Sequence, residues 1–126
     1  MNKRTYVLAA LAALLLSWSS NSQTPAKSEG PNPGVKPNRL MDRSDVRVTR
    51  VELQVGAVRS VHTHNDVRFH LFIPVSGQVE LTIGSGKPTE TAPGQAIYIE
   101  KGTPHGFRNT GSTPAMVMEV FAKDGV

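Results

Sequence analysis

The sequence predicts an all-β fold, a jelly roll or a small barrel, and three observations support this. Short runs in which apolar and polar residues alternate recur through residues 46–122, and this alternation is the period of a half-buried strand. Turn residues such as Gly84-Ser85-Gly86 separate the runs, and no interval between them is long enough for a helix. Many short, evenly spaced strands favour a closed or doubled sheet, because that arrangement hides the strand edges.

The clearest expected strand is the first of this region. Val51 and Leu53 lie on one face of it, Arg50 and Glu52 lie on the other, and Gly56 ends the run. Further runs follow at short intervals. The expected strands are therefore residues 46–55, 58–64, 67–75, 79–83, 96–99 and 115–122.

The 126 residues accommodate one domain, preceded by two segments of different character. The chain begins with the basic residues Lys3 and Arg4, followed by an apolar run and then a polar segment, an order that is typical of a secretory signal peptide. We expect this signal peptide to span residues 1–22 and to be removed. Residues 23–41 are rich in Pro and Gly and are expected to form a flexible linker. The β-barrel domain is then expected at residues 42–126 of an exported protein, periplasmic or secreted.

Composition excludes several classes of function. The chain has no cysteine, so disulfides, a lipid-modified cysteine and cysteine catalysis are all excluded. Without Lys3 and Arg4, the 14 basic residues become 12 against 10 acidic ones, which gives no charge footprint for nucleic acid. The apolar run near the start is too short to cross a bilayer comfortably, so no stable membrane span is expected after processing.

All four histidines lie between His62 and His105. Because residues i and i+2 of a strand point to the same face, His62 and His64 can present both imidazoles to one ion. Neutral imidazole is the commonest metal ligand in proteins. The pair therefore predicts a metal site, although an isolated histidine is more often a hydrogen-bonded core or surface residue.

Two longer motifs surround these histidines, and they resemble the motifs of the cupin family, G-x5-H-x-H-x3-4-E-x6-G and G-x5-P-x-G-x2-H-x3-N. The resemblance covers residues 53–109 directly. It implies a double-stranded β-helix, or jelly-roll barrel, in which His62, His64 and His105 bind a divalent transition metal ion. The matching residues are Gly56, His62, His64, Gly77, Gly94, Gly102, His105 and Asn109.

The chain departs from the family at the acidic ligand of the first motif. Counting back seven residues from Gly77 reaches His70, whereas counting four forward from His64 reaches Arg68. We expect His70 to take the glutamate position as a fourth metal ligand, which requires one extra residue, a β-bulge, between it and His64. If Arg68 occupied that position, the site would have three histidines, because arginine cannot ligate a cation.

The metal stays open among iron, nickel, copper, zinc and manganese. The resemblance implies an enzyme that acts on a small oxygenated molecule by dioxygenase, isomerase or lyase chemistry. The alternative is a non-catalytic cupin that binds metal or a small ligand, since a fold alone does not establish a reaction.

Few side chains offer themselves as further catalytic groups. Arg68, and with less support Arg59 and Arg108, could pair with an anionic substrate, and Tyr98 could donate a proton if it faced inward. Met116 and Met118 are expected to pack in the core rather than bind copper. The expected partner is a small molecule, and a homodimer that pairs through the strand at residues 45–55 is the candidate assembly.

Overall fold

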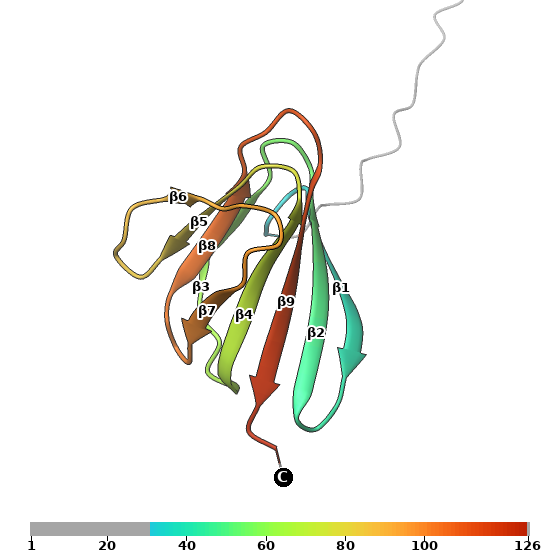
Figure 1. Ribbon diagram of the computed structural model, residues 1–126, viewed down its shortest axis with the longest axis vertical. Helices are drawn as coiled ribbons and strands as arrows, with labels where there is room; N and C mark the ends of the chain where they lie inside the picture. Colours follow the sequence, from blue (N-terminus) through green and yellow to red (C-terminus); the bar gives the residue numbers. More distant parts are fainter. Residues whose placement is uncertain (1–30, 126) are drawn as a thin grey trace, which may run out of the picture.

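The computed structural model describes residues 31–125. The expected signal peptide and the first part of the expected linker lie outside these residues. Within the described part the chain contains strands and no helix, and the strands form two antiparallel sheets (Figure 1). The same part holds no helix of the length and apolarity that crossing a membrane requires. The all-β prediction is confirmed, and two stacked antiparallel sheets are the jelly-roll arrangement.

One sheet has five strands in the order β1-β2-β9-β4-β7, and the other has four in the order β3-β8-β5-β6. Strands distant in sequence therefore pair, as β2 does with β9. The bounds are β1 Val35–Asp42, β2 Val46–Leu53, β3 Val58–His62, β4 Val67–Ser76, β5 Val79–Ile83, β6 Thr89–Glu90, β7 Ile97–Glu100, β8 His105–Asn109 and β9 Ala115–Lys123.

Each of the six expected strands has a counterpart, and three strands were not expected: β1, β6 and β8. Strand β6 is only two residues long. The five residues of β8, HGFRN, hold one apolar side chain besides glycine, so they show no alternation. These two strands form through pairing with β5, which has a strong pattern of its own.

The linker was expected to extend to residue 41, and this boundary is corrected by β1, which begins at Val35 and pairs along β2. Pro37 is compatible with this strand because β1 is at the edge of its sheet, where a missing N–H costs no ladder hydrogen bond on the open side. The same pairing covers β2 on both sides, so residues 45–55 are not a free edge for a second copy.

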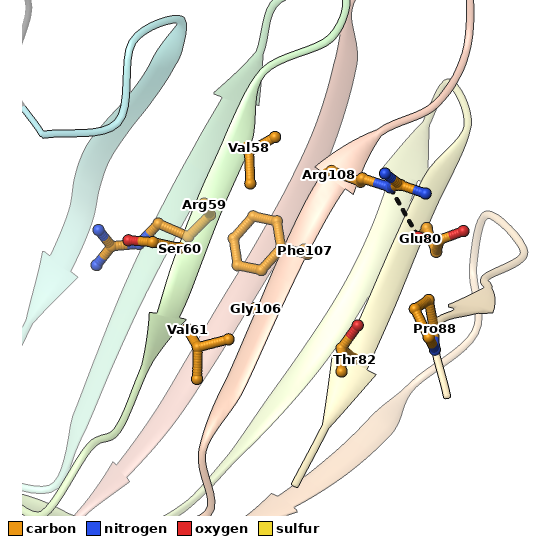
Figure 2. A pocket seen from close by; sticks show the side chains of 10 residues that line it. All are labelled: Val58, Arg59, Ser60, Val61, Glu80, Thr82, Pro88, Gly106, Phe107 and Arg108. Carbon is orange, nitrogen blue, oxygen red and sulfur yellow. Dashed lines mark hydrogen bonds and ion pairs between the residues drawn. The ribbon is translucent and has the colours of Figure 1, made fainter. Parts of the chain in front are cut away.

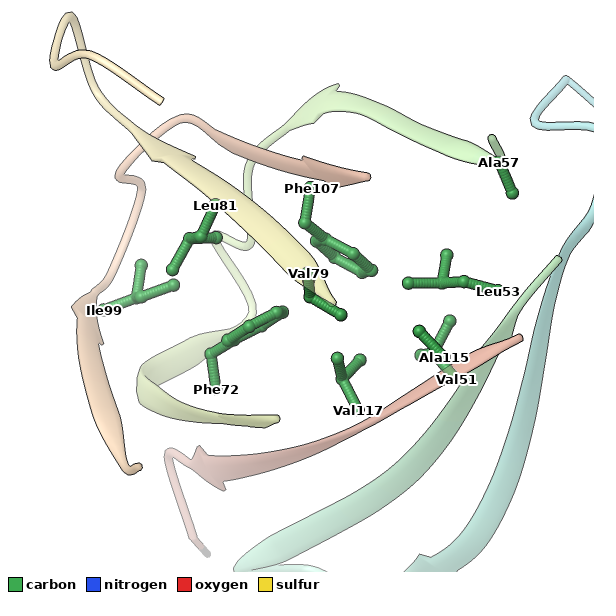
Figure 3. Packing of buried hydrophobic residues seen from close by; sticks show 10 residues of the cluster. All are labelled: Val51, Leu53, Ala57, Phe72, Val79, Leu81, Ile99, Phe107, Ala115 and Val117. Carbon is green, nitrogen blue, oxygen red and sulfur yellow. The ribbon is translucent and has the colours of Figure 1, made fainter. Parts of the chain in front are cut away.

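The hydrophobic core lies between the two sheets (Figure 3). Phe72 and Val117 point inward from the five-stranded sheet, and Phe107 and Val79 meet them from the four-stranded sheet. The rings of Phe72 and Phe107 are 5.0 Å apart in an edge-to-face arrangement, which is a favourable geometry for aromatic pairs. This core fills one part of the interior, and the histidines occupy another.

Candidate metal centre

The four histidine side chains gather inside the barrel, although they come from three strands and a loop. His62 ends β3, His64 follows in the loop, His70 lies on β4 and His105 begins β8. The ring centroids of His62 and His105 are 4.4 Å apart, and those of His64 and His70 are 5.2 Å apart. His70 and His105 are each only 1% exposed. The strands thus bring together all four predicted metal ligands.

A β-bulge in β3 shapes this cluster. Arg59 pairs with Phe107 and His62 pairs with His105, so three steps on β3 correspond to two steps on β8. The extra residue puts Arg59 and His62 on the same inward face, which simple alternation would forbid. Gly106 makes room for the bulge, because a Cβ atom there would lie 3.0 Å from the Arg59 carbonyl oxygen and 3.2 Å from the Val61 nitrogen.

A second bulge lies in β4, where Val67 pairs with Lys123 and Phe69 with Ala122. As a result Val67 and His70 are both buried, whereas Arg68 between them is exposed. The sequence called for one extra residue between His64 and His70, and the β4 bulge supplies it. His70 therefore points into the barrel, whereas Arg68 points out.

Hydrogen bonds to backbone carbonyls fix the orientation and the tautomer of two of the imidazole rings. Nδ1 of His62 lies 2.8 Å from the Ser60 carbonyl oxygen, and Nδ1 of His105 lies 2.9 Å from that of Thr103. A carbonyl only accepts, so in both rings Nδ1 carries the proton and Nε2 carries the lone pair. Metal-binding histidines characteristically donate their other ring nitrogen in this way.

Glu119, on β9, is the acidic member of the cluster, and the sequence did not point to it. One ligand atom from each of His62, His64, His105 and Glu119 lies within 4.8 Å of the other three. A signal for it existed, because Glu119 shares its parity with Val117 and Phe121, the buried face of the last strand. An acidic residue on a buried strand face is rare unless it has a partner.

The residues fit a divalent cation by a test that does not depend on the family. Nε2 of His64, His70 and His105 and Oε1 of Glu119 are buried, and none has a hydrogen-bond partner within residues 31–125. Buried polar atoms without partners cost free energy. The ligand atoms of His62, His64, His105 and Glu119 also lie within 4.8 Å of one another, and a cation would satisfy unpartnered atoms grouped in this way.

Burial keeps the cluster largely uncharged in the absence of a cation. Loss of hydration lowers the pKa of His62 and of His64 to about 4 and that of His70 to about 3, and it also lowers the pKa of His105. Burial raises the pKa of Glu119 to about 7, against a smaller opposing effect of Arg59 and Arg47. Neutral imidazoles are the form that binds metal.

Two side chains proposed from the sequence as catalytic candidates lie on the outside of the barrel. Tyr98 is 55% exposed and stacks on Phe69 at 4.9 Å between ring centroids. The Arg68 Nε donates to the Lys123 carbonyl oxygen at 3.2 Å. Neither residue therefore contacts the histidine cluster, because β4 and β7 turn these positions to the outer face of their sheet.

The methionines of β9 are also not part of the cluster. Met116 and Met118 are half-buried and alternate with the fully buried Val117. Their register partners on β4 are Ser76 and Ile73. They lie on the outer face of the five-stranded sheet rather than in the core between the sheets.

Two hollows adjoin β3, and only one of them reaches the cluster. The first, about 240 Å³, lies over β3, β8 and β5 and contains the Arg108–Glu80 ion pair of 2.7 Å (Figure 2). The Arg59 guanidinium points away from this hollow in Figure 2. The second, about 290 Å³, is lined by both Arg59 and Glu119 and is therefore the cavity that borders the candidate metal centre.

Comparisons with known proteins agree with this architecture. The profile of the family described as "Cupin domain" matches residues 49–121. No curated protein sequence matches the chain. Among solved structures, TT1209 from Thermus thermophilus superposes with a TM-score of 0.64 at 25% identity, covering 71% of this chain and 83% of that one.

Two similar structures are of enzymes, and both are longer than the matched region. The polyketide cyclase RemF from Streptomyces resistomycificus has a TM-score of 0.63 at 23% identity, over 72% of this chain and 66% of its own. The DMSP lyase DddQ from Ruegeria pomeroyi DSS-3 has a TM-score of 0.63 at 18% identity, over 71% of this chain and 47% of its own. At these identities the likeness shows the fold alone.

Proposed function

Because the chain belongs to the cupin family, we propose that it is a metal-dependent enzyme that acts on a small oxygenated molecule by oxidation, isomerisation or elimination. The observation that carries this proposal is the convergence of buried, unpartnered ligand atoms at one point between the sheets. Purely structural packing would satisfy such atoms internally or replace them with apolar groups.

In this proposal His62, His64 and His105 hold the cation, and the fourth ligand comes from the neighbouring pair His70 and Glu119. The compact group of ligand atoms includes Glu119, whereas the prediction from the sequence favours His70. When bound, a cation of iron, nickel, copper, zinc or manganese with an open position would supply Lewis acidity or, for some of these metals, redox chemistry.

The pair His70 and Glu119 also supplies a proton-transfer group. Whichever of the two does not ligate is left beside the centre, buried and with one free lone pair or one proton. In the metal-free chain burial raises the pKa of the Glu119 carboxyl to about 7, and a bound cation would lower it again.

The central test is elemental analysis of the protein purified from its native location, followed by metal removal and reconstitution. A bound transition metal in about one-to-one ratio, lost on Ala substitution of the histidines, supports the centre. Metal bound in this way without turnover of any small oxygenated molecule would favour the alternative, a non-catalytic metal-binding or ligand-binding cupin. Absence of any metal would overturn the proposal.

We further propose export with removal of residues 1–22, on the basis of the charged start and apolar run already described. Intact-mass measurement on protein from the source cell tests this, and a mass that includes Met1 would contradict cleavage. A homodimer is also proposed, although not through residues 45–55, because β1 and β9 cover both sides of β2. Sedimentation analysis tests the dimer.

A further inference from the structure

The cavity of about 290 Å³ beside the candidate metal centre is lined on one side by charged residues and elsewhere mainly by apolar ones. Val51 reaches it from β2 and Val35 from β1. Its rim includes Asn32, whose side-chain oxygen accepts hydrogen bonds of 2.8 Å from both the Ser60 backbone nitrogen and the Ser60 hydroxyl. The turn that precedes β1 is thereby fastened to β3, and the cavity has a defined shape.

Arg59 brings a positive charge into this cavity. Its register partner Phe107 is 3% exposed in the core, and directly paired residues point to the same face of a sheet. The β3 bulge is what turns Arg59 inward beside His62. The guanidinium charge is close enough to lower the pKa of His62, His105 and Glu119.

Arg59 lines the same cavity as Glu119, and its charge lowers the pKa of that carboxyl. Within residues 31–125 Arg59 makes no ion pair. Arg47, by contrast, lies over the Phe121 ring and pairs with Asp66 at 3.2 Å. A half-buried guanidinium that forms no ion pair is available to bind an anion that enters the cavity.

We infer that Arg59 binds the carboxylate group of the small molecule on which the centre acts, with the apolar part of that molecule against Val35 and Val51. This inference rests on the proposed function and names its substrate class, a small monocarboxylate. Arg59 is a substrate-binding residue in this role. Metal binding itself does not require it.

The chemistry of the cavity favours a carboxylate over other anions. A guanidinium presents two parallel N–H groups that match the two oxygens of a carboxylate. Arg59 is the one basic residue of this lining, which suits a singly charged group, whereas a phosphate group carries up to two negative charges and is usually held by several donors. Two valine side chains in the wall suit a short apolar chain attached to the acid group.

The test is calorimetric titration of the zinc-loaded protein, and of the metal-free protein in parallel, with butyrate and with its uncharged analogue butyramide. We expect wild type to prefer butyrate. We expect Arg59→Gln to weaken butyrate binding by about tenfold or more, as loss of a charged hydrogen bond does, and to remove the preference over butyramide. Arg59→Lys should keep part of the preference. Arg108→Gln, on the outer face, should leave it unchanged.

A second variant guards against a fold defect. Val35→Phe keeps the guanidinium but fills the cavity, so it should weaken butyrate and butyramide alike. Zinc content and melting temperature report whether each variant is folded. Failure of wild type to bind butyrate, or an equal preference in wild type and Arg59→Gln, overturns the inference. A chain that takes up none of iron, nickel, copper, zinc and manganese would overturn the proposed function, and the metal-free titration would then decide the role of Arg59 separately.

Discussion

Nε2 of His70 lies 3.8 Å from Oε1 of Glu119, and both atoms are buried without a hydrogen-bond partner among residues 31–125. This contact is not an ion pair at neutral pH, because burial lowers the pKa of His70 to about 3 and raises that of Glu119 to about 7. Both side chains are close enough to one another to contact the same cation. The first property to measure is therefore how much each of them contributes to metal affinity.

We expect Glu119→Gln to weaken zinc binding more than His70→Gln, because Glu119 belongs to the compact group of ligand atoms. Loss of a residue that only orients a ligand costs about 10–100-fold in affinity. We expect His70→Gln to fall in that range and Glu119→Gln to exceed it. Competition with a chelator of known affinity measures both, and the reverse order would assign the fourth ligand to His70.

Ala substitution of His62, His64 or His105 should remove most of the bound metal. It should also abolish the rise in melting temperature on metal addition, since a ligand that binds only the folded state stabilises it by about 2.7 kcal/mol at 100 times its Kd. Metal content and thermal melts with and without metal measure this. Full metal content in any of the three variants would exclude that residue from the ligand set.

Asn109→Ala is the matched control for these histidine variants. Asn109 is buried, and its amide donates to the carbonyl oxygens of Leu53 and Thr113. Its removal should lower stability by about 1–3 kcal/mol, equally with and without metal. A loss of metal in this variant would show that general destabilisation alone can empty the site.

The metal-free protein should lose stability as the pH falls from about 6.5 to about 4. The pKa values of His62, His64 and His70 are about 4, 4 and 3 in the folded chain against 6.5 in the unfolded one, so the unfolded chain takes up more protons in this window. Glu119 acts in the opposite sense: its raised pKa gives stability that is present below pH 4.5 and lost as the pH rises through about 7.

Thermal melts across this range measure the balance, and Glu119→Gln isolates one side of it. Removing the carboxyl should make the fall in melting temperature on acidification steeper, because the opposing contribution is gone. The melting temperature could instead stay constant between the pKa of the histidines in the unfolded chain and their pKa in the folded chain. That result would mean that burial does not keep these histidines neutral.

Gly106→Ala should disturb the β3 bulge and with it the metal site. The new Cβ atom would meet the Arg59 carbonyl oxygen and the Val61 backbone at 3.0–3.3 Å, so β3 must move and His62 with it. We expect weaker metal binding together with a loss of about 1–3 kcal/mol. Gly111→Ala has comparable contacts, but they are to the Gln78 side chain, so it should leave metal binding intact.

Much of the fold and part of the site were open to prediction from the sequence, for a definite physical reason. Alternation of side chains marks a strand whenever one of its faces is buried, and this found β2, β4 and β9. It failed for β1 because that strand is an exposed edge with no apolar face, and its Pro content is typical of a linker. A strand that is stabilised mainly by pairing with its neighbours shows only weak alternation of apolar and polar residues in its own sequence.

The site shows the same limit more sharply. His62 and His64 follow from their i, i+2 spacing, and the parity of Glu119 places it on a buried strand face, but Arg59 does not follow from any local pattern. Arg59 turns inward only through a bulge, and a one-residue shift moves a side chain to the opposite face. Glu119 reaches the histidines only because β9 pairs with β4, the strand of His70, which is distant from it in the sequence. Pairing between strands that are distant in the sequence cannot be predicted from local side-chain alternation.

His70→Glu tests the departure from the family most directly. The buried side chain of residue 70 faces the cluster, so the substitution replaces a nitrogen donor with an oxygen donor inside the site. We expect metal still to bind, with preference moved from nickel, copper or zinc toward manganese, because carboxylate suits harder ions. Without metal the new carboxylate would face Glu119, and the variant should be less stable than wild type.

Arg68→Glu is the control, since Arg68 lies on the same strand but points outward. This control should change neither the metal preference nor the stability of the metal-free protein. Competition binding among the metals measures the preference, and an unchanged preference in His70→Glu would leave a centre formed by His62, His64, His105 and Glu119 without His70.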